Sequence, residues 1–116
     1  CSLARAGVKR ENIILDPGVG FGKGLKDSIT IINNIGKLND MAGLTMLGLS
    51  RKSFLGKITG IKEASQRDFA TLGADAMAVI SGVKLLRTHN VKAAVQMTQV
   101  INYCINAKGG ACENIY

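Results

Sequence analysis

Three short apolar runs punctuate the chain, and a longer stretch follows each one in which apolar residues recur every three or four positions. The runs occupy residues 13–15, 45–49 and 83–86. The short runs are typical of strands and the longer periodicity is typical of helices, which we expect at residues 25–39, 64–81 and 92–106. The resulting order β-α-β-α-β-α predicts an α/β fold, in which helices cover a parallel sheet.

The same pattern predicts which side chains are buried. The first run has no polar alternation, so we expect its strand to be buried on both faces. The expected inward positions of the three helices are Leu25, Ile29, Ile32, Ile35 and Leu38; Phe69, Leu72, Ala76, Val79, Ile80 and Val83; and Val91, Ala94, Val95, Thr98, Ile101 and Ile105. Residues 1–10 are expected to end a helix with Gly7 as its C′ residue. Residues 54–60 are expected to be loose, and residues 108–116 a frayed tail.

Polar side chains follow all three runs at nearly equal intervals. Asp16, Ser50 and Arg87 stand where the predicted strands leave the core. The carboxyl ends of parallel strands lie on one rim, which is where (β/α) barrels carry their chemistry and where phosphate sites often follow the last two strands. Three strands cannot close a barrel of eight, so we interpret residues 1–116 as one partial domain.

The first strand runs directly into a glycine-rich turn. Pro17 ends the ladder, and we expect Gly18, Gly20, Gly22 and Gly24 to let the backbone bend tightly. The turn matches neither a P-loop nor a dinucleotide fingerprint, because the required glycine and hydroxyl positions hold other residues. It is therefore either a simple strand-to-helix connection or a wall around a ligand.

Asp16 and Phe21 each have two interpretations. Asp16 is either a capping or ion-paired acid, or a ligand carboxylate that accepts two hydrogen bonds from a planar N–H edge such as that of guanine or pterin. Phe21 is either a core residue or an aromatic wall over a flat substrate.

Cations follow the second and third strands. Lys52 can donate to ring acceptors or steady an anion as a point charge, and Ser53 can either cap the next turn or touch a ligand. Arg87 and His89 are two residues apart, so they are expected to face one site together. A guanidinium and an imidazole near the start of a helix suit a phosphate or diphosphate, although a lone histidine is also commonly a structural group.

Composition narrows the class of protein. The 116 residues carry a formal charge of +7 and only five aromatic side chains. The charge fits a solvated basic surface or an anionic ligand, and scattered basic residues with few aromatics make nucleic acid a weaker third choice. No stretch is long enough to cross a membrane, and three cysteines without C-x-x-C spacing favour a reducing cytoplasm over a disulfide or zinc framework. Because residue 1 is Cys rather than Met, we expect a fragment or a processed product.

Three motifs together resemble dihydropteroate synthase. They are Leu-Asp-Pro-Gly-x-Gly-Phe-Gly-Lys at residues 15–23, Gly-x-Ser-Arg-Lys-Ser-Phe-x-Gly at residues 48–56 and Arg-x-His-x-Val at residues 87–91. The resemblance implies that this chain forms strands six to eight of a (β/α)8 barrel, which belongs to an enzyme of folate biosynthesis. That enzyme joins 6-hydroxymethyl-7,8-dihydropterin diphosphate to 4-aminobenzoate and releases diphosphate, and it is the target of sulfonamides.

The resemblance also implies roles for single residues. Asp16 would bind the pterin, Phe21 would lie beside the aminobenzoate, and Ser53 would meet the carboxylate end of the aminobenzoate.

Three basic residues would be catalytic. Lys52 would contact the pterin, Arg87 would stack on the pterin and hold the diphosphate, and His89 would bind the diphosphate. Arg51 would have no more than an electrostatic role, and Asn90 replaces the Asp that members often have there.

Other implications concern what lies outside the chain. A Mg²⁺ would take its ligands from the missing N-terminal part, none from this chain, and a homodimer is possible.

Two alternative functions stay open. One is a pterin-binding methyltransferase-type barrel, against which residues 50–53 argue. The other is an inactive fragment that only binds pterin or diphosphate, and for the isolated chain we expect inactivity.

Overall fold

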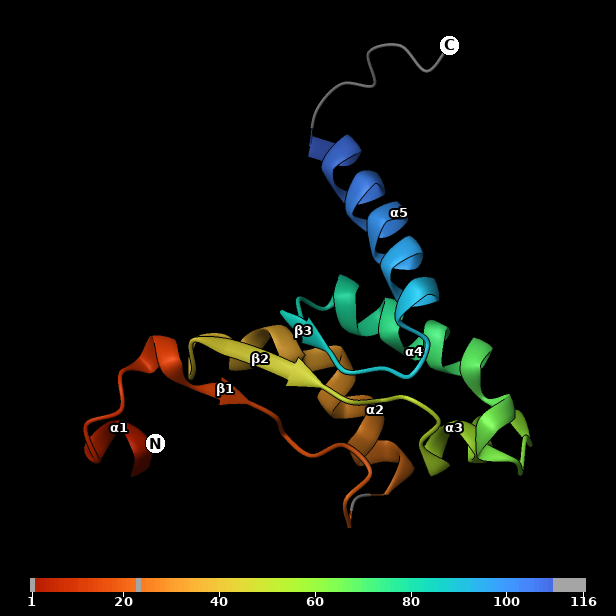
Figure 1. Ribbon diagram of the computed structural model, residues 1–116, viewed down its shortest axis with the longest axis horizontal. Coiled ribbons are helices and arrows are strands. Elements are labelled where there is room, and N and C mark those ends of the chain that lie inside the picture. The colour runs from red at the N-terminus through yellow and green to blue at the C-terminus, as the bar shows by residue number, and fades with distance from the viewer. Residues whose placement is uncertain (1, 23, 110–116) are drawn as a thin grey trace.

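The computed structural model describes residues 2–22 and 24–109. Its strands are β1 (Ile14–Leu15), β2 (Leu44–Leu47) and β3 (Leu85–Leu86). Its α-helices are α1 (Ser2–Arg5), α2 (Leu25–Asn34), α3 (Ser53–Thr59), α4 (Asp68–Ile80) and α5 (Val91–Gly109). Short 3₁₀ helices cover Arg10–Asn12, Ile35–Leu38 and Ala64–Gln66. Figure 1 shows how these elements follow one another.

The strands form one parallel sheet in the order β1-β2-β3, which confirms the predicted α/β topology. Ile14 pairs with Leu44, and Leu47 pairs with Leu86. All three carboxyl ends therefore point the same way. The polar residues that follow β2 and β3 consequently come together on one rim.

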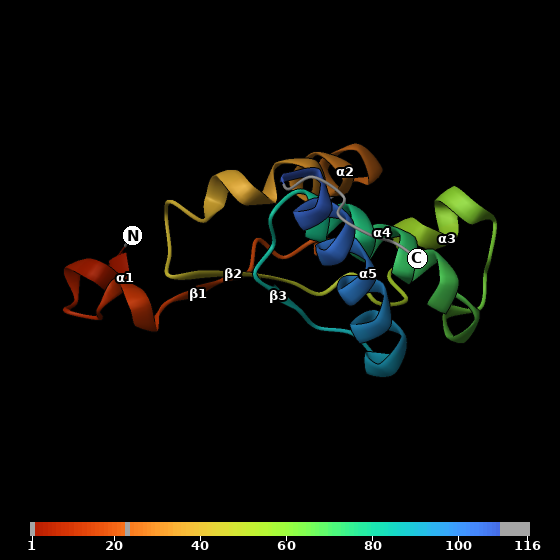
Figure 2. The same ribbon diagram turned by 90° about the horizontal axis from the view of Figure 1, so that it is seen from above.

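The core lies between the sheet and the helices on one side of it. Figure 2 shows α2, α3 and α4 on that side, and the largest fully buried side chains include Ile35, Leu47 and Leu49. Leu47 and Leu49 are two residues apart, so they face the same layer of helices. Ile14 is 54% exposed, so the prediction that the first strand is buried on both faces is wrong for this chain. In the part of the chain that the structure describes, α2, α3 and α4 lie on one side of the sheet.

Asn39 connects the 3₁₀ helix after α2 to two other elements. Its side-chain amide donates to the carbonyl oxygen of Gly82 at 2.9 Å, and its side-chain oxygen accepts a hydrogen bond from Thr45 Oγ1 at 2.6 Å. Gly36 lies so close to the turn after α4 that a Cβ there would be 2.4 Å from the carbonyl oxygen of Ser81. The predicted helix at residues 25–39 therefore ends as a 3₁₀ turn packed against that backbone.

The buried face of α4 differs from the predicted one. Phe69 is 86% exposed and Ile80 is also exposed, whereas Thr71, Asp75 and Ala78 are buried. Small side chains let a helix approach a sheet closely, and here they form the packed face. The other predicted inward residues, Leu72, Ala76, Val79 and Val83, are half-buried, so the prediction is wrong for Phe69 and Ile80 only.

Two other expectations are corrected. Residues 53–59 form α3 rather than a loose segment, and Gly60 ends this helix with a φ of 75°. On α5, Ala94 is buried as expected, but Val91, Val95 and Ile105 are exposed. Figure 1 shows why: α5 packs on α4 near its start and then projects away from the other elements.

The ends of the chain give mixed outcomes. Gly7 has a φ of 88° and the amide of Val8 donates to the carbonyl oxygen of Leu3, so Gly7 is the C′ residue of α1 as predicted. Helix α5 includes residues 108 and 109, where a frayed tail was expected, and residues 110–116 lie outside the described part of the chain. Cys104 is exposed and unpaired, while Cys1 and Cys112 are outside the described residues.

The described chain is more open than a compact domain of its length. Its radius of gyration is 16.0 Å, whereas about 13 Å is typical of a compact fold of this size. No helix within residues 2–22 and 24–109 has the length and apolarity needed to cross a membrane.

Candidate active site at the strand carboxyl ends

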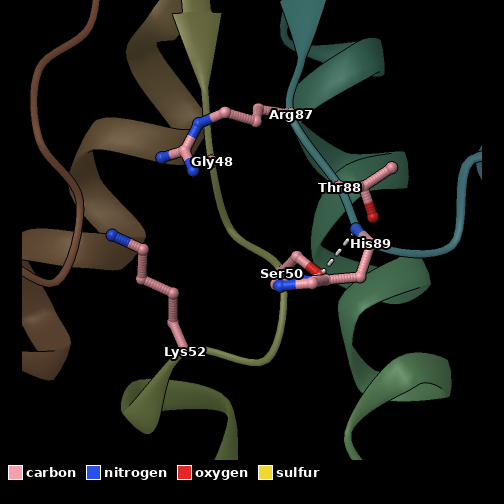
Figure 3. A pocket seen from close by; sticks show the side chains of 6 residues that line it. All are labelled: Gly48, Ser50, Lys52, Arg87, Thr88 and His89. Atoms are coloured by element: carbon pink, nitrogen blue, oxygen red, sulfur yellow. Dashed lines mark hydrogen bonds between the residues drawn. The ribbon is translucent and has the colours of Figure 1, made fainter. Parts of the chain in front are cut away.

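A small cavity of about 100 Å³ lies at the carboxyl ends of β2 and β3. Figure 3 shows its walls, which come from the loops that follow these two strands. The lining residues are Gly48, Ser50, Lys52, Arg87, Thr88 and His89. Three basic side chains thus share one cavity, and the prediction that Arg87 and His89 face one site is confirmed.

Arg87 lies directly over the backbone of Gly48 (Figure 3). A Cβ at Gly48 would be 2.6 Å from Nη2 of Arg87 and 3.0 Å from its Cζ. Any larger residue would therefore displace the guanidinium. Backbone hydrogen bonding fixes the start of this side chain, because the amide of Arg87 donates to the carbonyl oxygen of Leu47 at 2.9 Å.

Ser50 holds His89 from the neighbouring loop. Its Oγ lies 2.7 Å from Nδ1 of His89 and accepts a hydrogen bond from the backbone amide of His89 at 3.2 Å. When the hydroxyl donates to Nδ1, a neutral imidazole carries its proton on Nε2, where it can donate to an anion. Sequence reasoning placed Ser50 on the rim but did not find this contact, since it joins residues from two different strands.

Lys52 is held by the glycine turn. Its ammonium lies 4.0 Å from the centroid of the Phe21 ring and donates a hydrogen bond to the carbonyl oxygen of Val19. A Cβ at Gly20, whose φ is 85°, would be 2.9 Å from Cδ of Lys52. Partial burial and the positive charge of Arg87 lower the pKa of Lys52, while the carboxylate of Asp16 opposes this shift. An anion bound beside Lys52 and Arg87 would relieve their repulsion.

Three of the four glycines give the turn the tight backbone bend that was predicted. Gly18, Gly20 and Gly22 have positive φ angles, whereas Gly24 has an extended backbone and precedes α2. Oδ1 of Asp16 accepts a hydrogen bond from the amide of Gly18 at 2.8 Å, as in an Asx turn. Asp16 thus shapes its own turn, and its side chain stays exposed next to the cavity rather than lining it.

The other predicted site residues lie around the cavity. Phe21 is 71% exposed, so the alternative that it is a core residue is wrong. Ser53 is the exposed first residue of α3 and gives that helix no side-chain cap. Arg51 does not line the cavity, because its guanidinium forms an ion pair with Asp68 on α4 at 2.7 Å. Lys23 lies outside the described residues.

Within residues 2–22 and 24–109, no group of three or more His, Cys, Asp or Glu side chains could hold a metal ion. The described part of the site is instead basic. It is suited to an anionic group, with a flat aromatic surface at Phe21 beside it.

Comparison with known proteins identifies the family. The model of the pterin binding enzyme family matches residues 2–89. The chain belongs to the pterin binding enzyme family. Among relatives in this family, a dihydropteroate synthase type-3 of Escherichia coli is 45% identical over 95 residues, which are 79% of this chain and 36% of that protein.

Solved structures of dihydropteroate synthases are also similar to this chain. The dihydropteroate synthase of Thermus thermophilus in complex with 6HMPPP has a TM-score of 0.80 and 32% identity, over 90% of this chain and 41% of that one. The same enzyme in complex with 4-aminobenzoate has a TM-score of 0.72 and 33% identity over 78% of this chain and 35% of that one. The Yersinia pestis dihydropteroate synthase with a sulfonamide drug complex has a TM-score of 0.84 and 26% identity, over 91% of this chain and 38% of that one.

These matches also define how much of the fold is present. The chain spans about a third of the length of the curated relatives it matches. Its parallel α/β sheet matches part of the dihydropteroate synthase barrel, as the sequence motifs implied. That its strands are the sixth to eighth of the barrel stays a prediction.

Proposed function

We propose that this chain supplies the diphosphate-binding and part of the pterin-binding site of a dihydropteroate synthase. The observation that carries the proposal is the single cavity lined by Lys52, Arg87 and His89 at the strand carboxyl ends. These are the residues of the motifs that resemble the family. The relatives' complexes with 6HMPPP and 4-aminobenzoate support the same substrates here.

The proposed reaction is a substitution at the methylene carbon of the pterin. The C–O bond to diphosphate breaks and its electron pair leaves with the diphosphate. The amine nitrogen of 4-aminobenzoate forms the new C–N bond and then loses a proton. Arg87 and His89 would stabilise the charge that develops on the leaving group, and Lys52 would contact the pterin and complete the positive wall. No nucleophilic side chain is needed.

The neighbours of the cavity would bind the rest of the two substrates. The exposed carboxylate of Asp16, held by the amide of Gly18, would accept hydrogen bonds from the N–H edge of the pterin. The exposed ring of Phe21 would lie beside the aminobenzoate, and Ser53 at the start of α3 would meet its carboxylate. A sulfonamide would compete for that second position, as the complex of the Yersinia pestis enzyme suggests.

Further parts of the proposal concern the whole protein. Mg²⁺ would be bound by the portion of the fold that this chain does not span, since the described residues offer it no ligand cluster. We also expect a cytoplasmic enzyme that acts on small molecules, with neither nucleic acid nor membrane as a partner, and for which a homodimer is one option.

Two alternatives are kept because the chain covers a part of the barrel. A pterin-binding methyltransferase-type domain would bind pterin without using diphosphate. An inactive fragment would bind pterin or diphosphate without turnover. The basic cavity favours the synthase over the methyltransferase-type domain, since two cations and an imidazole N–H donor around one cavity fit a diphosphate better than a neutral substrate.

Two measurements test the proposal. Calorimetric titration of the full chain with inorganic diphosphate should show binding that Arg87→Ala weakens and Lys57→Ala, on the exposed side of α3, leaves unchanged. A diphosphate-release assay with the pterin diphosphate should respond to added 4-aminobenzoate. Binding without release would support the inactive fragment, and binding of pterin but not diphosphate would support the methyltransferase-type domain. Absence of all binding would refute the site.

A further inference from the structure

Arg51 has an unusual backbone conformation at the edge of the site. Its φ is 59°, which makes it the one non-glycine residue with a positive φ in the described part of the chain. This left-handed region is disfavoured for residues with a Cβ, and such conformations persist where the surroundings determine them. Both sequence neighbours, Ser50 and Lys52, line the cavity, whereas Arg51 itself does not. The conformation of Arg51 therefore sets how its two neighbours enter the site.

The start of α4 holds the backbone of Arg51 on both sides. The amide of Arg51 donates to Oγ1 of Thr71 at 3.0 Å, and its carbonyl oxygen accepts a hydrogen bond from Nη1 of Arg67 at 2.9 Å. Thr71 is 2% exposed, so its hydroxyl is fixed by packing. Arg67 is fixed in turn, because its Nε donates to the carbonyl oxygen of Ile61 at 2.9 Å.

The side chain of Arg51 is held at a third point. Its Nε donates to Oδ1 of Asp68 at 2.7 Å and its Nη2 donates to Oδ2 at 3.1 Å. The two side chains are 33% and 28% exposed. An isolated surface ion pair contributes little to the free energy of folding. A bidentate arginine–carboxylate pair has a defined geometry, however, so it further restricts a residue whose backbone is already held by two hydrogen bonds.

Asp68 also faces the loop that follows β3. The hydrogen bond from Arg51 lowers the pKa of Asp68, and His89 and Asn90 lower it further. Asn90 accepts a hydrogen bond from the amide of Ala93 at 3.2 Å and so caps the start of α5. Asp68 is thus bonded to the loop after β2 through Arg51 and lies near the loop after β3.

We propose that Asp68 is a positioning residue, which together with Arg67 and Thr71 holds Arg51 in its left-handed conformation and thereby directs Lys52 and Ser50 into the anion site. The proposal rests on the proposed function for the identity of the ligand. The positioning itself is a property of the ligand-free chain. A merely stabilising ion pair would change the unfolding of the chain without moving Lys52.

The contact between Lys52 and Phe21 provides a direct readout. Because the ammonium lies 4.0 Å from the ring centroid, ring current should shift the ε-methylene protons of Lys52 upfield in an NMR spectrum of the full chain. The signal is assigned with Lys52→Arg. No ligand is needed, so this measurement stands even if diphosphate binding, the test of the proposed function, fails.

Four single substitutions and one double substitution distinguish the effect of the backbone conformation of Arg51 from the effect of its ion pair. Arg51→Ala removes the guanidinium and disfavours a positive φ, so the upfield shift should be lost. Arg51→Gly also removes the guanidinium but accepts a positive φ freely, so the shift should be retained. Asp68→Asn should reduce the shift in the native background and have no effect in the Arg51→Gly background. Asp40→Asn, at an exposed carboxylate before β2, is the matched control and should change nothing.

Diphosphate binding should follow the same order. We expect the Kd for inorganic diphosphate to rise about tenfold in Arg51→Ala and to stay close to the native value in Arg51→Gly. Retention of the upfield shift in Arg51→Ala would overturn the proposal. An equal effect of Asp68→Asn in both backgrounds would also overturn it, and so would a native Lys52 signal at its random-coil position.

Discussion

We expect the buried carboxyl group of Asp75 to lower the free energy of unfolding of the chain at neutral pH. Asp75 lies on α4 with 0% of its surface exposed, and within the described residues neither side-chain oxygen has a hydrogen-bond partner. Burial raises the pKa of this carboxyl to about 6. We therefore expect Asp75→Ala to stabilise the chain at neutral pH, because it removes a charge that the folded state must bury.

The size of the effect follows from the shift in pKa. In the unfolded chain the carboxyl has its ordinary pKa of 3.8. Between this value and about 6 the folded state binds more protons than the unfolded state, so stability falls as pH rises through this window. Each pKa unit corresponds to about 1.4 kcal/mol, so the folded state loses about 3 kcal/mol by neutral pH. Removing the side chain leaves a small cavity, which costs about 1 kcal/mol at every pH.

The assay is urea unfolding followed by far-ultraviolet circular dichroism, at about pH 3.5 and about pH 7.5, on either side of the titration window. Asp75→Ala should be more stable than the native chain by about 2 kcal/mol at the higher pH and less stable by about 1 kcal/mol at the lower one. Asp40→Ala, at an exposed carboxylate, should show no comparable change. A difference between Asp75→Ala and the native chain that is the same at both pH values would refute the reasoning.

Four further predictions follow from the geometry. In a complete synthase that contains this segment, Lys52→Ala or Arg87→Ala should cut turnover about a hundredfold in a diphosphate-release assay, and near-native rates in both would remove the site assignment. Gly48→Ala should raise the Kd for diphosphate in calorimetry, because its Cβ would be 2.6 Å from Nη2 of Arg87; unchanged affinity would mean that Arg87 is not held there. Gly36→Ala should lower the unfolding free energy by about 1–3 kcal/mol, whereas Gly73→Ala, with open space around its Cβ, should raise it slightly in the same titration. The lowered pKa of Asp68 means that its contribution to stability is present above its ordinary pKa of 3.8 and is lost as the pH falls through the lower folded value, a dependence that Asp68→Asn should abolish in acid unfolding.

The rim of the site could be predicted because it depends on local rules. Each short apolar run marks a strand, and the polar residues after parallel strands must share one edge of the sheet. Arg87 and His89 share a cavity for the simpler reason that they are two residues apart on one extended segment. These inferences require no knowledge of which elements pack together.

The packed face of α4 could not be predicted in this way. Periodicity ranks residues by hydrophobicity, and it selected Phe69 and Ile80 over Thr71 and Ala78. Close packing selects by size as well, and the smaller side chains allow α4 to approach its neighbours. The burial of Thr71 matters for the site, because it fixes the hydroxyl that accepts a hydrogen bond from the amide of Arg51.

The glycine turn has a second role that the sequence motif did not reveal. The sequence left the turn as either a simple strand-to-helix connection or a wall around a ligand, and the roles of Asp16 and Phe21 in ligand binding stay predictions. In the structure the turn first serves Lys52: Val19 accepts its hydrogen bond, Phe21 stacks with its ammonium, and Gly20 leaves room for its side chain. A basic side chain has several staggered rotamers of similar energy, and contacts on two sides select one of them. The turn after β1 and the fixed backbone of Arg51 therefore act on the same lysine from opposite ends, the turn on its ammonium and Arg51 on its backbone, so the two loops orient one cation together.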